Sequence, residues 1–385
     1  MTGFTDLIDF TRASSGTYID PAGVRQTAGP DQPRFDHDRV TGAARGLLIE
    51  NAATNLVRHS RDLSEPVWSG TATVSNSTGG AWRVENSAGD PGSVQQNISV
   101  ADDTSVYCFS VDLQKDPSAQ TEAIFRPALV GGTSQITGVA DFKMHPATGA
   151  FDVGAGLIDG GVIDAGDWWR IWCTIQNNGS GNTLIRPVIT PSYTGGAITI
   201  DYPQVELGAY PTSPIVTGAA AVTRAADLAT VPLDRFGYNP AAGTLLLDAI
   251  VADPDAVQYF TTIAVGTPDN RLYELRNGLG QITAVTSVSG SQTTFTILPE
   301  GSIARGDRLR AAIALGGGTM TASANGGAPV SAAIPASLPA VTTLHIGSNF
   351  TGNVGANGLY RSLMYIPRRL SAAEIMALTA SDGAP

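Results

Sequence analysis

Hydrophobic and polar residues alternate along the middle of the chain with the period of a β-strand. Residues 107–113 place apolar side chains at every second position, and so do residues 169–175. Aromatic and β-branched residues, which favour strands, dominate both runs. Because successive side chains of a strand point to opposite faces, each run predicts a strand with one buried face. The buried face is predicted to consist of Tyr107, Phe109, Val111 and Leu113 in the first run, and of Trp169, Ile171, Cys173 and Ile175 in the second.

Short runs of this kind recur in both halves of the chain and predict an all-β protein. Residues 56–227 are expected to form one β-sandwich, which ends in a passage rich in proline and alanine at 210–226. The pattern resumes in residues 228–385, which are expected to form a second set of sheets. The strands predicted there are 244–251, 259–265, 271–276, 293–297, 308–315 and 319–324.

Two local signals complete the prediction for the second half. The sequence NGG from Asn325 predicts a hairpin turn, because asparagine and glycine tolerate positive φ. The sequence SAAE from Ser371 matches a helix capping box and is followed by apolar residues. We therefore expect one helix, near residues 371–379, in a chain that is otherwise built of strands.

Residues 1–55 form a third region, an N-terminal arm. Five arginines are spaced among turn-forming residues there, and the segment is too short to bury a core by itself. Its apolar residues need cover, either from the chain's own sandwich or from neighbouring subunits or other proteins of a particle. We expect the arm to attach the protein to other proteins of a particle and to form a homo-oligomer, with a trimer favoured over a pentamer. We also expect the two sandwiches to stay folded when the arm is removed. The apolar residues in question are Phe4, Leu7, Ile8, Phe10, Tyr18, Phe35, Leu47, Leu48 and Ile49.

Charge and composition narrow the classes of partner. The chain has 34 acidic and 23 basic residues, a net charge of −11, so attraction to nucleic acid or anionic lipid is not expected. Residues 311–344 carry no charge, yet glycines and prolines interrupt them, which favours strands and turns over a membrane-spanning helix. The first residues lack the basic start and apolar run of a signal peptide. We expect no membrane insertion and synthesis in a cytoplasm.

Residues able to catalyse or to bind metal are scattered. The sequence contains no nucleophile elbow, zinc-binding helix, phosphate loop or dinucleotide fingerprint. The pairs Asp164/Asp167 and Asp253/Asp255 lie beside turn residues, and Asp36-His37-Asp38 would point to alternate sides of an extended chain. We therefore predict neither a catalytic set nor a metal centre. A calcium site that uses Asp269-Asn270 or Asn349 stays open.

The two cysteines give little information on their own. Cys108 and Cys173 cannot cross-link a chain of this size or supply a four-ligand zinc site. Both lie in predicted strands of the middle sandwich and are expected to be small buried thiols. Whether they pair stays open, because a disulfide needs Cα atoms within about 7 Å.

Aromatic residues suggest where a sugar could bind, because aromatic faces stack on the C–H side of a pyranose. All five tryptophans lie between 68 and 172, and Trp169 shares its face with apolar residues and is expected in the core. Trp82, next to Arg83 and a Gly-Gly pair, is the better candidate for an exposed platform, although a core position is still favoured for it. The candidate glycan-binding residues are Trp68, Trp82, Arg83, Tyr193 and Asn349.

Three stretches resemble a family of virion proteins from tailed phages and gene-transfer agents, of the spike or fibre type. They are FTRASSGTYIDPAGV from Phe10, PRFDHDRVTGAARGLLIENAATNLVRHSRDLSEPVW from Pro33, and AVTRAADLA from Ala221. The resemblance implies that the middle segment is a β-sandwich like those of carbohydrate-binding modules.

The last third resembles concanavalin A-like jelly rolls of the laminin-G type. The stretches are GDRLRAAIAL from Gly306, the hairpin ending at Asn325-Gly326, LHIGSNFTG from Leu344, and GLYRSLMYIPRRLSAAEIMAL from Gly358. The last stretch implies a strand at 359–366 and a short closing helix. Hydrolases of this fold carry a pair of glutamates on one strand, which this chain lacks.

Together these observations predict a non-enzymatic virion spike or fibre protein that attaches a particle to host-surface polysaccharide. Two alternatives use the same folds: a capsule depolymerase or glycan hydrolase, and a structural connector without a ligand. Fold alone does not distinguish them. The predicted location is the virion surface, after synthesis in the cytoplasm of a bacterial host.

Overall fold

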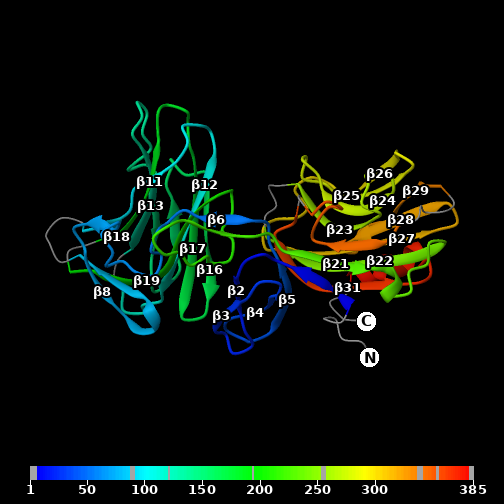
Figure 1. Cartoon of the computed structure of the whole chain (residues 1–385), viewed down its shortest axis with the longest axis horizontal. Coiled ribbons are helices and arrows are strands. Elements are labelled where there is room, and N and C mark those ends of the chain that lie inside the picture. Colours follow the sequence, from blue (N-terminus) through cyan, green and yellow to red (C-terminus); the bar gives the residue numbers. More distant parts are fainter. Residues whose placement is uncertain are drawn as a thin grey trace. The chain divides into compact units, whose positions relative to one another are not determined.

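The computed structural model describes residues 7–86, 92–119, 122–192, 195–252, 257–335, 341–352 and 355–380. These residues are almost entirely strands and turns, which confirms the all-β prediction. The chain divides into two compact units (Figure 1). The first comprises residues 1–38, 42–52 and 225–385, and the second comprises residues 39–41 and 53–224. The unit boundaries at 53 and 225 lie within three residues of the predicted 56 and 228. The arm, however, is not a separate region.

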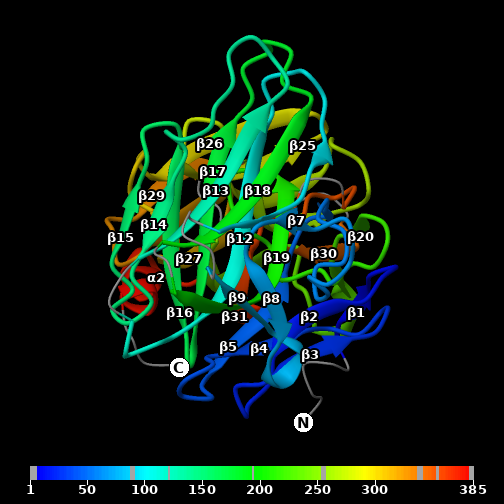
Figure 2. The ribbon, with the colours of Figure 1, turned by 90° about the vertical axis from the view of Figure 1, so that its left-hand side faces the viewer.

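The second unit is a sandwich of two antiparallel sheets, whose long strands run side by side in Figure 2. One sheet has the order β15 (Phe151–Val153), β14 (Phe142–Met144), β13 (Ala123–Val130), β18 (Leu184–Pro191), β10 (Val94–Gln95) and β7 (Ser69–Gly70), with β11 (Ile98–Ser99) on β18. The other has the order β16 (Asp159–Ala165), β17 (Trp168–Gln176), β12 (Val106–Gln114), β19 (Ala197–Leu207), β9 (Trp82–Glu85) and β8 (Thr73–Asn76). A short 3-10 turn, η1 (Thr78–Gly80), precedes β9, and β6 (Ala53–Asn55) pairs with β20 (Val222–Arg224).

The alternation in β12 and β17 builds the core of this sandwich. The predicted inward residues of β12 are all buried in one hydrophobic cluster with Ile171, Cys173 and Ile175 of β17, and Trp169 packs against it. The two strands pair antiparallel, with Phe109 opposite Cys173. The predicted faces are therefore correct.

The first unit is a second sandwich, the predicted jelly roll. One sheet has the order β1 (Asp9–Thr11), β21 (Leu228–Pro232), β30 (Thr343–Ile346), β23 (Gln258–Ala264), β24 (Arg271–Arg276), β25 (Ile282–Val288) and β26 (Ser291–Leu298), and is called the β1–β26 sheet below. The other has the order β29 (Val330–Ala333), β28 (Thr319–Ala324), β27 (Arg308–Gly316), β22 (Ala242–Val251), β31 (Gly358–Ile366), β5 (Ala44–Ile49) and β4 (Phe35–His37). The hairpin β2 (Gly16–Ile19) and β3 (Arg25–Ala28) and the 3-10 turn η2 (Leu233–Arg235) complete the unit.

The helix predicted near 371–379 is α2 (Ala372–Ala380). Its capping box forms: the Ser371 backbone N–H donates to Glu374 Oε2 at 2.7 Å, and the Glu374 N–H donates to Ser371 Oγ at 3.3 Å. Ile375 packs against Ala312 and Ala314 of β27. Within the described residues, no helix is long and apolar enough to cross a membrane.

The arm belongs to the sheets of the jelly roll. Strand β5 pairs with β31, so that in Figure 1 a blue strand joins strands from the other end of the chain, and β1 pairs with β21. Leu47 and Ile49 are 1% exposed in the core. This arrangement corrects the expectation that the jelly roll folds without residues 1–55. The same chain covers the described apolar residues of the arm that pack in this core; Phe4 lies outside the described residues.

Four charged residues of the resembling stretches meet inside this unit. Asp227 accepts a hydrogen bond from Arg12 Nη1 at 2.9 Å and another from Arg34, while Arg34 Nη1 donates to Glu50 Oε2 at 2.7 Å. A Cβ at Gly16 would lie 3.1 Å from the Arg34 side chain, so this glycine leaves room for the guanidinium. These stretches are thus long-range partners in one folded unit.

Candidate functional site

Two of the predicted sugar-binding tryptophans are core residues. Trp68 and Trp82 are each 7% exposed and belong to the hydrophobic core of the second unit. Their indole N–H groups donate to the backbone carbonyls of His59 at 3.1 Å and Arg61 at 3.0 Å. Trp82 therefore takes the core position and not that of an exposed platform, because its strand directs this side chain inward, and its assignment as a glycan-binding residue is wrong.

The other candidates do not complete a site around them. Arg83 is exposed on the opposite face of β9 and pairs with Glu85 at 3.4 Å. Tyr193 lies outside the described residues. Asn349 belongs to the first unit, where its Oδ1 accepts hydrogen bonds from the N–H and hydroxyl of Thr351. Of the four described candidates, two are core residues, and the other two, Arg83 and Asn349, belong to different units.

An aromatic patch lies on the outer face of the β1–β26 sheet. In β24, Leu272 enters the core between the sheets, so Arg271 and Tyr273 lie on the outer face. The Tyr273 ring lies 5.3 Å from the half-buried ring of Tyr259 on β23, between centroids. Its hydroxyl accepts a hydrogen bond of 2.7 Å from the amide of the exposed Gln292 on β26. Three strands thus place two tyrosine rings and an amide side by side.

Arg271 joins this patch to the loop that holds Asn349. Its Cζ lies 4.6 Å from the centroid of Tyr273 and 5.3 Å from that of Phe350, both within cation–π range. Ser287 is the cross-strand partner of Arg271 and in turn pairs with Gln292. We call Tyr259, Arg271, Tyr273, Gln292 and Phe350 the Arg271 patch.

A second row of polar residues borders the patch. His345 on β30 stands opposite Thr262 on β23, which stands opposite Tyr273. His345 Nδ1 and Thr262 Oγ1 are buried and find no hydrogen-bond partner among the described residues. Burial lowers the pKa of His345 and raises that of Tyr273, so both side chains are neutral at pH 7.

The patch was missed because it combines four separate elements. The sequence did predict a strand at 271–276 and named Asn349, the neighbour of Phe350. The alternation of Arg271 and Tyr273 with apolar Leu272 is a local signal for the face. The approach of Tyr259, Gln292 and Phe350 depends on strand register and on a loop, which local pattern does not determine.

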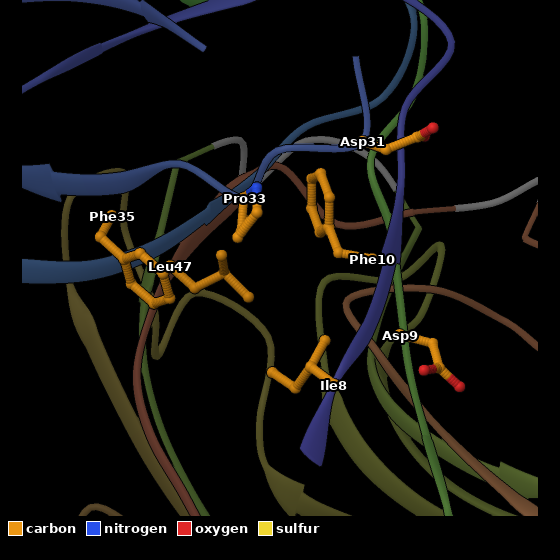
Figure 3. A pocket seen from close by; sticks show the side chains of 7 residues that line it. All are labelled: Ile8, Asp9, Phe10, Asp31, Pro33, Phe35 and Leu47. Carbon is orange, nitrogen blue, oxygen red and sulfur yellow. The ribbon is translucent and has the colours of Figure 1, made fainter. Parts of the chain in front are cut away.

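The arm contributes an apolar cleft with a cavity volume of about 410 Å³. It lies between β1, the end strand of one described sheet, and β4 and β5 at the end of the other. Figure 3 shows apolar side chains around the opening, with the carboxylates of Asp9 and Asp31 directed away from it. The cleft offers no hydroxyl-binding groups to a sugar and suits an apolar side chain. Its apolar lining consists of Ile8, Phe10, Pro33, Phe35 and Leu47.

The candidates for metal binding are used in local structure. Asp36 accepts a hydrogen bond from the Ile19 N–H, and His37 Nδ1 lies 3.1 Å from the Ile19 carbonyl oxygen, which ties β4 to β2. Asn270 Oδ1 accepts the Ser289 N–H, and the Asp269 carbonyl accepts the Gly290 N–H. Within the described part of the chain, no three His, Cys, Asp or Glu residues gather where a metal ion could bind.

The remaining described candidates are used in local structure or are buried. Asp164 pairs with Lys115 at 2.7 Å, and its Oδ1 also accepts the Gly166 N–H in a turn. Asp253 and Asp255 lie outside the described residues. Cys108 and Cys173 are buried free thiols.

Comparisons with known proteins add the following. No protein-family model and no curated protein matches the chain. Among solved structures, the Ruminococcus gnavus IT-sialidase CBM40 is 13% identical over 37% of this chain and 84% of its own, with a TM-score of 0.32. Mouse laminin alpha1 chain domains LG4-5 are 10% identical over 78% of this chain and 92% of theirs, with a TM-score of 0.29. The CBM22-1-CBM22-2 tandem domain of Paenibacillus barcinonensis Xyn10C is 9% identical over 82% of this chain and 99% of its own, with a TM-score of 0.27. Similarities at these identities and TM-scores support no statement about function. The function proposed below is inferred from the chain's own residues.

Proposed function

We propose that the protein is a non-catalytic spike or fibre protein of a phage or gene-transfer particle, and that it binds host-surface polysaccharide through the Arg271 patch. The observation that carries the glycan-binding part is the row of Tyr259, Tyr273 and Gln292 on the outer face of one sheet. The half-buried Tyr259 offers a stacking face and is supported by the buried ring of Tyr273, which is 3% exposed. The exposed amide of Gln292 offers donors and an acceptor to sugar hydroxyls.

The test of glycan binding is the variant Tyr259→Ala. Removal of an aromatic anchor typically costs about 1–3 kcal/mol, so binding to a retained capsular polysaccharide should weaken about 5- to 150-fold. Phe151→Ala in the second unit is the matched control, because Phe151 is 43% exposed and lies outside the patch. Equal binding by the two variants would place the glycan elsewhere.

The same experiment separates the two alternatives. A capsule depolymerase would release reducing ends from the polysaccharide, whereas an attachment protein retains it intact. A structural connector would neither bind nor cleave it. Reducing ends measured beside retained polymer therefore decide among the three functions.

Attachment to the particle is the second part of the proposal and is supported by the resemblance of the N-terminal stretches to virion proteins. The cleft between β1 and β4 fits an extended apolar segment of another virion protein. β1 and β4 are the end strands of the two described sheets, where a further strand could be added, and the lining takes apolar side chains. The protein then stands at the virion surface after synthesis in the bacterial cytoplasm. Phe10→Asp should reduce its incorporation into particles.

A homo-oligomer belongs to the proposal as well, because several weak sugar sites act together and raise avidity by about 10²–10⁴. The arm's apolar residues no longer require it, since the jelly roll covers those in the core. Light scattering should give a multiple of the 39.7 kDa chain mass. A monomer at micromolar concentration contradicts this part alone.

A further inference from the structure

The guanidinium of Arg271 is held by aromatic rings and not by a carboxylate of the described residues. No carboxylate of the described residues forms an ion pair with it, although its side chain is only partly exposed. Other partly exposed arginines do have one: Arg61 pairs with Asp201 at 2.8 Å, and Arg308 pairs with Asp248 at 2.6 Å. Other arginines, Arg186 among them, also have no carboxylate partner within the described residues; what distinguishes Arg271 is that two aromatic rings, one from β24 and one from a loop, hold its guanidinium.

The surroundings of Arg271 satisfy only part of its chemistry. The rings of Tyr273 and Phe350 interact favourably with the cation. The N–H groups of a guanidinium lie in its plane and need acceptors, which rings beside it do not supply. The Nε atom is buried and makes no hydrogen bond with any described residue. The two rings thus orient a partly exposed guanidinium that donates no hydrogen bond to any described residue.

We propose that Arg271 binds the carboxylate of an acidic sugar, so that the polysaccharide bound at the patch is an acidic one; this inference rests on the proposed function. A carboxylate accepts two parallel hydrogen bonds from a guanidinium, which neutral hydroxyls do not match. Tyr259 and Gln292 then hold the sugar ring beside the charged group. Diffuse attraction does not explain such binding, because the net charge of the protein repels a polyanion at long range.

The test uses three acidic polysaccharides, polygalacturonate, polysialate and hyaluronate, each beside its methyl ester. Esterification removes the charge and keeps the sugar backbone. Binding to the full-length protein and its variants is measured by biolayer interferometry. Arg271→Gln removes the guanidinium, and Arg271→Lys keeps the charge without the planar fork. Arg186→Gln in the second unit is the matched control, because it makes the same change of net charge outside the patch.

We expect the wild-type protein to bind at least one acidic polymer and to bind its ester about tenfold or more weakly. Arg271→Gln should lose the preference for the acid form, Arg271→Lys should bind that form more weakly than the wild type, and Arg186→Gln should keep the preference. Equal binding of acid and ester, unchanged in Arg271→Gln, overturns the inference and leaves glycan binding intact. If no polymer binds in either form and Tyr259→Ala does not change the binding of capsular polysaccharide, both the proposed function and this inference are wrong. Melting curves show whether each variant is folded. If Arg271→Gln does not fold, Arg271→Lys is used to test the inference instead.

Discussion

Arg12 and Asp227 form a buried ion pair although 215 positions separate them in the sequence. Arg12 Nη1 lies 2.9 Å from Asp227 Oδ1, and both side chains are fully buried. Arg34 binds the other oxygen of the same carboxylate, and the Glu50 backbone N–H also donates to it. Asp227 therefore contacts two guanidinium groups of the arm, and Glu50 of the arm compensates one of them as well.

Loss of this carboxylate should destabilise the jelly roll strongly. Removing one partner of a buried ion pair leaves an uncompensated charge and costs about 3–5 kcal/mol, so Asp227→Ala should lower the free energy of unfolding by that amount. Asp9→Ala is the control, because its exposed pair with Arg235 at 2.8 Å is worth about 0–1 kcal/mol. Urea unfolding followed by circular dichroism measures both. All five tryptophans lie in the second unit, so a fluorescence transition that also shifts by several kcal/mol would contradict a local effect.

Trp82 should matter for stability and not for sugar binding. Truncation of a large buried aromatic residue costs about 3–5 kcal/mol, and Trp82→Ala also removes the hydrogen bond to the Arg61 carbonyl. Arg83→Ala, one position along the same strand, removes an exposed ion pair and should cost less than about 1 kcal/mol. Tryptophan fluorescence during urea unfolding measures the difference. A stable Trp82→Ala protein that has lost glycan binding would restore the platform interpretation.

Local pattern predicted what depends on local geometry. Alternation identified the buried faces of β12 and β17, the capping box located α2, and the passage before 225 marked the unit boundary. For Trp82 the same alternation indicates the core position, because Trp82 and Val84 alternate with Arg83 and Glu85, and charged residues belong to the solvent face.

Long-range contacts could not be predicted in this way. Strand β5 pairs with β31 from the other end of the sequence, and its register follows from the whole sandwich. The same holds for the Arg271 patch, whose rings come from two strands and a loop. The three stretches that resemble virion proteins do share one structural feature, because Arg12, Arg34, Glu50 and Asp227 form one buried cluster.

Deletion of residues 1–52 should unfold the jelly roll. The deletion removes β1, β4 and β5 from the ends of both sheets and exposes the core that Leu47 and Ile49 close. We expect insoluble protein, or soluble protein with much weaker strand signal in circular dichroism. Deletion of residues 1–6 is the control and should leave the fold intact, since the described sheets begin at Asp9. Soluble, folded protein without residues 1–52 would show that the arm is an independent attachment segment.

Glu274 should make the jelly roll less stable as the pH rises. Its side chain is 0% exposed, with Thr261 Oγ1 donating to Oε2 at 3.1 Å, and burial raises its pKa from 4.5 to about 7. The folded state therefore holds a proton that the unfolded state releases above pH 4.5. Stability from this group is complete below pH 4.5 and is lost as the pH rises to about 7.

The expected size of this loss is about 3 kcal/mol between pH 4.5 and 7, from about 1.4 kcal/mol for each unit of pKa difference. Glu274→Gln keeps the shape of the side chain and the hydrogen bond from Thr261 but has no proton to release. Between pH 4.5 and 7 the variant should therefore become more stable relative to the wild type. Comparing the two proteins separates the effect of Glu274 from that of His345. Burial lowers the pKa of His345, so His345 makes the fold more stable as the pH rises. Urea unfolding at pH 5, 6, 7 and 8 measures the difference. Parallel stability curves for the two proteins would mean that Glu274 titrates alike in the folded and unfolded states, and its burial would then have no consequence for pH dependence.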